Sequence, residues 1–324
     1  MNLDTSLQAA LAAVSKAAAL CEIARASLVT AESAEKSDRS PVTIADLACQ
    51  ISVVSALQAA TPGVPVVGEE DSSLLQTPGE LTARLQSLLL RCGLPADLPT
   101  LRSTLDRAGH AGGNRGAFWT LDPIDGTKGF LRGEQYAVAL ALIVDGRVEL
   151  GVLGCPRMPA RGMAAGGSLF RAVRGKGCLE IPLGGGEAKP ALVQMTADTR
   201  QANLCESVES GHTSHGMAAR ITEQLGIRAA PFRMDSQCKY AAVARGDATL
   251  YLRLPSKPGY REKIWDHAAG SILVEEAGGK VTDTRGQPLD FGRGRELSDN
   301  LGVVVSNGKI HAMVVDAVRA VTGV

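Results

Sequence analysis

A continuous apolar run from Tyr136 to Val144 constrains the fold of this chain more than any other segment. Its length predicts a β-strand, and the Asp145-Gly146 pair that follows it is a strong hairpin-turn signal. Arg147 to Leu153 then predicts the returning strand. Apolar runs at 118–121 and 168–173 predict further strands, so the first half of the chain is expected to contain a sheet built from hairpins.

The second half of the chain alternates between helical and strand patterns. Apolar residues that recur at steps of three and four predict helices, and short apolar runs predict strands. The predicted helices cover 3–21, 44–57, 217–225, 239–244 and 266–277, with a last helix from His311, and the further predicted strands cover 64–67, 249–254 and 301–305. Stacked layers of helices and sheets follow from this alternation.

Two segments are expected to interrupt these layers. Residues 72–117 combine a helical patch at 81–90 with prolines and glycines, and we interpret them as an insertion or mobile flap. The glycines near 185–200 indicate a boundary between two lobes, which we expect to be residues 1–190 and 191–324.

The charge balance argues against a general polyanion-binding protein. Lys plus Arg and Asp plus Glu are both 34, so the formal charge is zero, whereas a nucleic-acid binder needs a basic surface.

Apolar residues make up 45% of the chain and aromatic residues only 3%, so the core must consist mainly of Ala, Val, Leu and Ile. No window of about 20 uninterrupted apolar residues predicts a membrane span. We expect neither a nucleic-acid nor a membrane partner, and leave the oligomeric state open with a monomer favoured.

The cysteines indicate a reducing compartment. They form no CxxC pair and no zinc spacing, and stand at positions 21, 49, 92, 155, 178, 205 and 238. The N-terminus lacks the pattern of a signal peptide, so we expect a cytoplasmic protein, or a plastid or mitochondrial one if a transit peptide was removed. Cys155 and Cys178 follow neighbouring predicted strands and are a candidate redox pair, the alternative being two separate reduced thiols.

Carboxylates gather where apolar runs end. Glu69 follows the run at 64–67, Asp122 and Asp125 follow the strand at 118–121, and Asp266 stands at a helix start, while Asp46 lies near the start of the second helix. Like charges repel, and a divalent cation removes the cost of holding them together. Oxygen ligands suit Mg²⁺, which typically also binds substrate phosphate.

Within residues 122–127, Asp-Pro-Ile-Asp-Gly-Thr, the proline bends the chain so that both aspartates can face one site. The Ile124 carbonyl and the Thr127 hydroxyl are further oxygen atoms that can face it.

Each acidic segment also has an ordinary structural interpretation. Asp-x-x-Asp-Gly is compatible with a polar turn, Thr43 with Asp46 with a variant capping box, and Asp266 with a charge at a helix N-terminus. Glu69 and its neighbours are compatible with a solvated loop. Their joint occurrence after apolar segments favours a shared metal site.

Four motifs resemble the inositol monophosphatase-like superfamily of magnesium-dependent, lithium-sensitive phosphomonoesterases. They are Pro-Val-Thr-x-x-Asp at 41–46, Gly-Glu-Glu at 68–70, Asp-Pro-Ile-Asp-Gly-Thr at 122–127 and Trp-Asp-His-Ala-Ala-Gly at 265–270. They occur in the family's order, and the resemblance extends over nearly the whole chain. It implies an α/β, or α+β layered, fold: a stacked α-β-α-β-α sandwich of the inositol monophosphatase and fructose-bisphosphatase type.

Segments at 206–215, 234–240, 251–255 and 263–267 resemble more closely the 3'(2'),5'-bisphosphate nucleotidases of that superfamily. This resemblance implies hydrolysis of the 3'-phosphate of 3'-phosphoadenosine 5'-phosphate, its 2' isomer or its sulfated form, with two or three Mg²⁺ ions. The implied metal ligands are Glu69, Asp122, the Ile124 carbonyl, Asp125, Asp266 and Asp46. Asp46 and Thr127 are the implied catalytic residues that orient the attacking water, and Thr127, His212, Ser236, Lys239 and Arg253 the implied substrate-binding residues.

The residue chemistry agrees with a phosphatase that uses a metal-activated water. The chain has no P-loop, and a metal cluster supplies the activation that phosphate monoesters need. Arg253 lies two residues after Tyr251 on a predicted strand, so both side chains are expected on one face.

Two functions are alternatives to a bisphosphate nucleotidase. They are an inositol polyphosphate 1-phosphatase and a catalytically silent nucleotide sensor.

Overall fold

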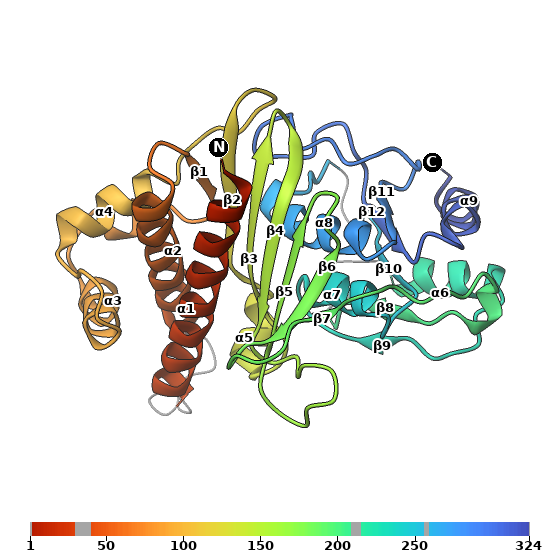
Figure 1. The fold of residues 1–324 in the computed structure, drawn as a ribbon, viewed down its shortest axis with the longest axis horizontal. Helices are drawn as coiled ribbons and strands as arrows, with labels where there is room; N and C mark the ends of the chain where they lie inside the picture. Colours follow the sequence, from red (N-terminus) through yellow and green to blue (C-terminus); the bar gives the residue numbers. More distant parts are fainter. Residues whose placement is uncertain (1, 30–39, 209–214, 256–258, 324) are drawn as a thin grey trace.

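The computed structural model describes residues 2–29, 40–208, 215–255 and 259–323 and folds them into five layers. Helices α1 and α2 cover one face of a large mixed sheet, α7 and α8 lie between that sheet and a smaller one, and α6 and α9 cover the far side of the smaller sheet (Figure 1). The helix bounds are α1 Leu3–Val29, α2 Ser40–Ala60, α3 Glu80–Arg91, α4 Leu98–Asp106, α5 Thr127–Arg132, α6 His215–Gln224, α7 Cys238–Arg245, α8 Ala268–Glu276 and α9 His311–Thr322, with 3-10 turns at Ser73–Leu75, Thr199–Gln201 and Ile264–Asp266.

The large sheet has the strand order β1-β2-β3-β4-β5-β6-β7, with β1 parallel to β2 and the other neighbours antiparallel. Its strands are β1 Val66–Gly68, β2 Ala117–Asp125, β3 Ala137–Val144, β4 Arg147–Cys155, β5 Ser168–Val173, β6 Cys178–Pro182 and β7 Lys189–Pro190. The predicted hairpin of β3 and β4 is confirmed.

Alternation along β3 explains why the sheet is buried on both faces. Val138, Leu140 and Leu142 pack in the core with α1 and α2, while alanines at the intervening positions face α8. Small side chains on that face let α8 approach closely: a Cβ added at Gly151 of β4 would lie 2.5 Å from Ile272 of α8. The continuous apolar run is therefore a strand with two buried faces.

The smaller sheet has the order β11-β12-β10-β8-β9. Its strands are β8 Leu204–Glu206, β9 Phe232–Arg233, β10 Leu250–Arg253, β11 Lys280–Thr282 and β12 Val303–Ser306. Leu250 and Leu252 of β10 face α6 and α9, whereas Tyr251 faces the middle helix layer. The large sheet ends at residue 190 and the smaller one begins at 204, which is compatible with the predicted lobe boundary, yet α8 packs on the large sheet, so the two parts share a core.

Helices α1 and α2 contain Leu3–Ser27 and Val42–Ala60, which are long and apolar enough to cross a membrane by length and composition alone. In this fold, their apolar side chains pack against each other and the large sheet.

Helix α2 begins at Ser40, so Thr43 lies inside it. The interpretation of Thr43 with Asp46 as a capping box is therefore wrong.

The prediction of a mobile flap at 72–117 is wrong. This segment contains α3 and α4, and their leucines Leu85, Leu89, Leu101 and Leu105 are fully buried in the same core as α2. The prolines that suggested a loop lie in the connection and at the start of α4, where the Asp97 side chain accepts a hydrogen bond from the Thr100 N–H. The segment continues into β2, which runs from Ala117.

The proposed redox pair of Cys155 and Cys178 is also wrong. The two residues lie on β4 and β6, with β5 between them, opposite Ser168 and Ala172 respectively. Two strand spacings of about 4.8 Å and four residues of about 3.3 Å place them roughly 16 Å apart, whereas a disulfide needs Cα atoms within about 7 Å. Cys155 instead lies beside Cys238, and both thiols are reduced.

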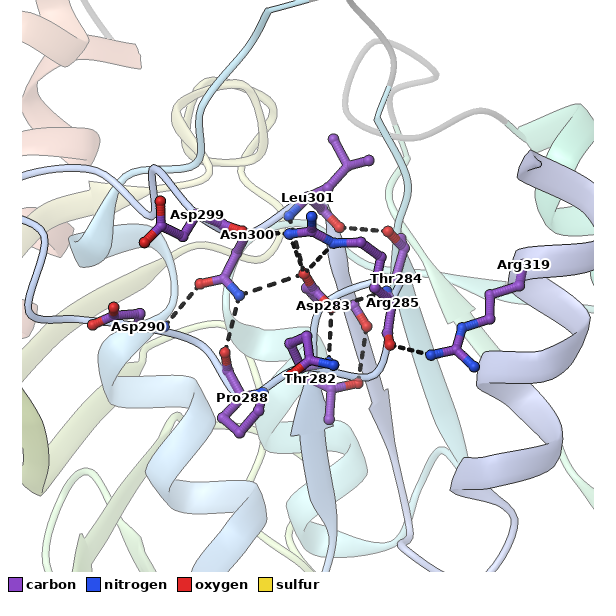
Figure 2. Close-up of polar contacts among 11 residues, drawn as sticks. Thr282, Asp283, Thr284, Arg285, Pro288, Asp290, Asp299, Asn300, Leu301 and Arg319 are labelled. Carbon is purple, nitrogen blue, oxygen red and sulfur yellow. Dashed lines mark hydrogen bonds and ion pairs between the residues drawn. The ribbon is translucent and has the colours of Figure 1, made fainter. Parts of the chain in front are cut away.

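The loop between β11 and β12 is ordered around one buried carboxylate. Asp283 accepts hydrogen bonds from the backbone and side chain of Arg285 and from Asn300 (Figure 2). The loop then pairs with the chain before α8, where the Ile264 N–H donates to the Arg295 carbonyl and the Leu297 N–H to the Glu262 carbonyl. The Asp283 network thus fixes a segment that supports the pocket described below.

Replacing Leu89 of α3 with alanine tests whether 72–117 belongs to the core. Because Leu89 is fully buried, Leu89→Ala is expected to lower the free energy of unfolding by about 2–4 kcal/mol. Its neighbour Leu90 is 67% exposed, so Leu90→Ala is the matched control, with an expected change below about 0.5 kcal/mol. Urea denaturation measures both, and equal small effects would contradict the packed arrangement.

Candidate active site

A β-bulge turns two aspartates toward the same pocket. Asp122 pairs with Ala139 and Asp125 with Ala137, so three steps on β2 match two on β3. Residues three apart on a regular strand face opposite sides, and the extra residue restores one common side. Pro123, which has no N–H to donate, lies within the bulge, as the sequence predicted from its bend.

Glu69 lies beside Asp122 because β1 and β2 are parallel. Their carboxyl ends meet at one sheet edge, where the Glu69 N–H donates to the Leu121 carbonyl at 3.3 Å. Gln50 of α2 fixes the next residue: its amide nitrogen donates to the Glu70 carbonyl at 2.6 Å, and its amide oxygen accepts from the Glu70 N–H at 3.0 Å. No motif singled out Gln50, although it stands one helical turn after Asp46.

Asp266 reaches the same pocket from the other half of the chain. It ends the 3-10 turn Ile264–Asp266, and α8 begins only at Ala268 with His267 as its N-cap residue, so the predicted helix 266–277 starts too early. Asp266 therefore lies before α8 rather than in its first turn, so it is not a charge at that helix start. Its carboxylate pairs instead with Arg253 at 3.2 Å.

The pocket has a volume of about 420 Å³ and combines acidic and basic walls. Its lining includes these predicted site residues: Glu69, Asp122, Ile124, Asp125, Thr127, Ser236, Lys239, Arg253 and Asp266. Asp46 is buried on α2 and is not part of this lining. Burial, followed by the charges of Glu70 and Glu69, raises its pKa well above the usual range. His212 lies outside the described residues.

Burial and mutual repulsion make this cluster of carboxylates expensive to ionise. Burial first, and then the charge of Asp266, raises the pKa of Glu69 to about 8. Burial and the neighbouring charge of Glu69 raise the pKa of Asp122 well above its usual range. Burial also raises the pKa of Asp125, although Lys239 and Arg253 oppose the shift.

One oxygen of this cluster points to a missing partner. Asp122 Oδ1 is buried and has no hydrogen-bond partner among the described residues. A buried polar atom without a partner destabilises the fold. A carboxylate oxygen finds a partner only in a proton, a hydrogen-bond donor or a cation. The repelling carboxylates and this orphaned oxygen both fit a bound divalent cation of the kind that oxygen ligands hold.

Gln237 connects the elements that carry the aspartates. Its backbone N–H donates to Asp125 Oδ2 at 2.5 Å, its side-chain nitrogen donates to the Trp265 carbonyl, and its side-chain oxygen accepts from the Gly270 N–H. A buried residue that joins β2, the 3-10 turn and α8 is a positioning residue. Its place between Ser236 and Lys239 is the signal that could have identified it.

The basic wall carries the predicted substrate-binding residues. Ser236, two residues before α7 begins, adopts a left-handed backbone conformation with φ of 65°, a strained geometry that is common at functional sites. The Lys239 Nζ donates to the Ser236 carbonyl at 2.8 Å. Tyr251 and Arg253 both line the pocket, as predicted from their spacing on one strand.

Comparisons with known proteins agree with this fold. A model of the inositol monophosphatase family matches residues 2–322. A protein named 3'(2'),5'-bisphosphate nucleotidase from Schizosaccharomyces pombe is 43% identical, covering 99% of this chain and 97% of that protein, and one of the same name from Oryza sativa is 41% identical, covering 97% and 93%. The solved inositol monophosphatase from Anabaena (Nostoc) has a TM-score of 0.64 at 22% identity, covering 99% of this chain and 97% of that one. The expected layered fold is confirmed.

The acidic cluster predicts how stability depends on pH in metal-free protein. A carboxyl whose pKa is higher in the folded chain than in the unfolded chain stabilises the fold at low pH, and this contribution is lost as the pH rises through the folded value. The folded value for Glu69 is about 8. The melting temperature of protein treated with EDTA is therefore expected to fall as the pH rises from about 4.5 to about 8.

Glu69→Gln should make this fall smaller because the amide cannot ionise. Thermal melts of both proteins with EDTA measure the effect, and added Mg²⁺ should restore the wild-type melting temperature at the higher pH. A melting temperature of the metal-free wild type that rises over this pH range would contradict the arrangement of charges.

Proposed function

Since this chain belongs to the inositol monophosphatase family, we propose that it removes the 3'-phosphate of adenosine 3',5'-bisphosphate in a Mg²⁺-dependent hydrolysis that yields AMP and phosphate. The 2' isomer and the sulfated nucleotide are the further candidate substrates. The observation that carries this proposal is that one pocket joins a cluster of repelling carboxylates to a pair of buried cations.

The carboxylates are the proposed cation ligands. Glu69, Asp122, Asp125 and Asp266 would hold the ions together with the Ile124 carbonyl, and Asp46 would serve a further ion or its water. Bound Mg²⁺ lowers the pKa of a water molecule and neutralises charge on the phosphoryl oxygens. Thr127, which is exposed to the pocket, and Asp46 are proposed to orient the attacking water.

The cations of the basic wall are the proposed site of the second phosphate. Arg253 offers a planar fork of N–H donors and Lys239 a compact charge, and both match an anionic phosphate. Burial lowers the pKa of Lys239, while the nearby charge of Asp125 opposes the shift. Ser236 adds a hydroxyl beside them, and His212 is proposed to contact the nucleotide.

The mouth of the pocket favours a nucleotide over an inositol polyphosphate. Among the residues that the structure describes, Tyr260 is the one exposed aromatic side chain, at 47%, and it lines the pocket together with the exposed Leu131. A purine base stacks well on such an exposed aromatic ring. An inositol ring has no flat aromatic face to use it.

Phosphate release tests the proposed function. Wild-type protein with Mg²⁺ is expected to release phosphate from adenosine 3',5'-bisphosphate faster than from inositol 1,4-bisphosphate. Removing even an outer partner of a metal ligand costs about 10- to 100-fold, so Asp125→Asn is expected to lower kcat by more than that. Asp71→Asn is the matched control, since Asp71 is an exposed acid outside the pocket lining.

Two results would contradict the proposal. Near-normal turnover by Asp125→Asn would refute the metal assignment. A wild-type protein that binds the nucleotide without releasing phosphate would instead support the silent-sensor alternative.

Tyr260→Ala tests the nucleotide preference separately. Loss of the stacking surface is expected to raise KM for adenosine 3',5'-bisphosphate about 10-fold, with little change for inositol 1,4-bisphosphate. Tyr260→Phe keeps the ring and should behave like the wild type. Equal KM values for Tyr260→Ala and wild type would remove the base-stacking assignment.

A further inference from the structure

Arg253, the proposed ligand of the second phosphate, is held from behind by a buried acid that no motif singled out. The Nε of Arg253 lies 2.7 Å from Glu262 Oε2, and its Nη2 lies 3.2 Å from Asp266 Oδ2. The side chains of Arg253 and Glu262 are only 14% and 8% exposed. The guanidinium plane is therefore fixed at two points on its protein side.

Glu262 is itself held in place by a chain of hydrogen bonds that leads into the core. The same oxygen that contacts Arg253 lies 3.1 Å from His267 Nε2, and His267 Nδ1 lies 2.7 Å from the Tyr240 hydroxyl. A carboxylate can only accept, so His267 Nε2 donates to Glu262, and the Tyr240 hydroxyl bonds the other ring nitrogen. His267 is fully buried.

The far end of this chain is rigid because Tyr240 packs directly on α8. A Cβ added at Gly270 would lie 2.4 Å from the Tyr240 ring, so only glycine allows this approach. The backbone of Glu262 is fixed as well, since its carbonyl accepts from the Leu297 N–H at 2.8 Å. Both the side chain and the backbone of Glu262 thus have one well-defined position.

Glu262, Asp266 and His267 lie close enough together to hold a metal ion, but a cation is already present there. Their candidate ligand atoms lie within 4.8 Å of one another. The guanidinium of Arg253 contacts two of the three residues and supplies the positive charge that such a cluster needs. The cluster therefore serves to orient Arg253.

We propose that Glu262 is a positioning residue that holds the Arg253 guanidinium ready to receive the second phosphate of the substrate. This inference rests on the proposed function, which supplies that phosphate. A guanidinium fixed before the substrate arrives loses less conformational freedom on binding, so preorganisation improves affinity. Glu262 should therefore affect KM more than kcat, and only for substrates that carry the second phosphate.

The test compares adenosine 3',5'-bisphosphate with adenosine 3'-monophosphate, which lacks the 5'-phosphate, at saturating Mg²⁺. Hydrogen bonds to charged groups are strong, so Glu262→Ala is expected to raise KM for the bisphosphate about 10- to 100-fold. KM for the monophosphate and kcat for both substrates should change little. Glu262→Gln keeps an acceptor oxygen for Arg253, and it should restore part of the loss.

Glu180→Gln is the matched control for removing a buried acid paired with arginine. Glu180 lies 2.7 Å from Arg245, with side chains 4% and 10% exposed, and is outside the pocket lining. It should change the melting temperature without changing either KM.

Three outcomes would overturn the inference. They are an unchanged KM for the bisphosphate in Glu262→Ala, a parallel rise of KM for both substrates, and a loss of kcat on both. A wild type that hydrolyses neither nucleotide would refute the proposed function and this inference with it. A wild type that hydrolyses both with equal KM would show that no second phosphate is recognised.

Discussion

Repulsion among buried carboxylates is the constraint on which the rest of this structure depends. Glu69, Asp122 and Asp266 come from three different parts of the chain and share one pocket with Asp125. Burial raises the pKa of each member, repulsion by neighbouring carboxylates adds to the shift at Glu69, Asp122 and Asp266, and Asp122 Oδ1 has no partner in the described residues. A protein that brings such groups together pays in stability unless a cation binds between them, so the cluster is best explained by the chemistry of that cation.

Two glutamines and one arginine of the surrounding structure hold the backbone of the acidic segments in place. Gln50 bonds both the N–H and the carbonyl of Glu70, and Gln237 bonds the backbone on both sides of Asp266, and neither adds charge. Arg295 donates to the Gly68 carbonyl at 2.5 Å and lies 4.8 Å from the centre of the Trp265 ring. These contacts join β1, the 3-10 turn and the loop of Figure 2, so that segments from both sheets keep one geometry at the pocket.

The sequence predicted those parts of the site that local chemistry determines. Pro123 within an acidic turn predicted that Asp122 and Asp125 face one side, and the period of β10 predicted that Tyr251 and Arg253 do the same. It could not predict positions that only tertiary packing decides. Leu85 and Leu89 form a buried face only because α2 lies against them, and β5 separates Cys155 from Cys178 although their strands follow closely in sequence. Glu262 lies outside every motif, and Gln237 lies in the segment 234–240 with no role assigned to it, since both roles arise from partners elsewhere in the chain.

The most direct test of the central claim is to locate divalent cations in crystals grown with Mn²⁺. This ion takes oxygen ligands as Mg²⁺ does, and its anomalous X-ray scattering reveals its position. Anomalous scattering is expected to place at least one ion in contact with carboxylate oxygens of Glu69 and Asp122, including the unpartnered Asp122 Oδ1. A pocket without an anomalous peak at saturating Mn²⁺, with Asp122 protonated or bonded to a neighbouring side chain instead, would contradict the account.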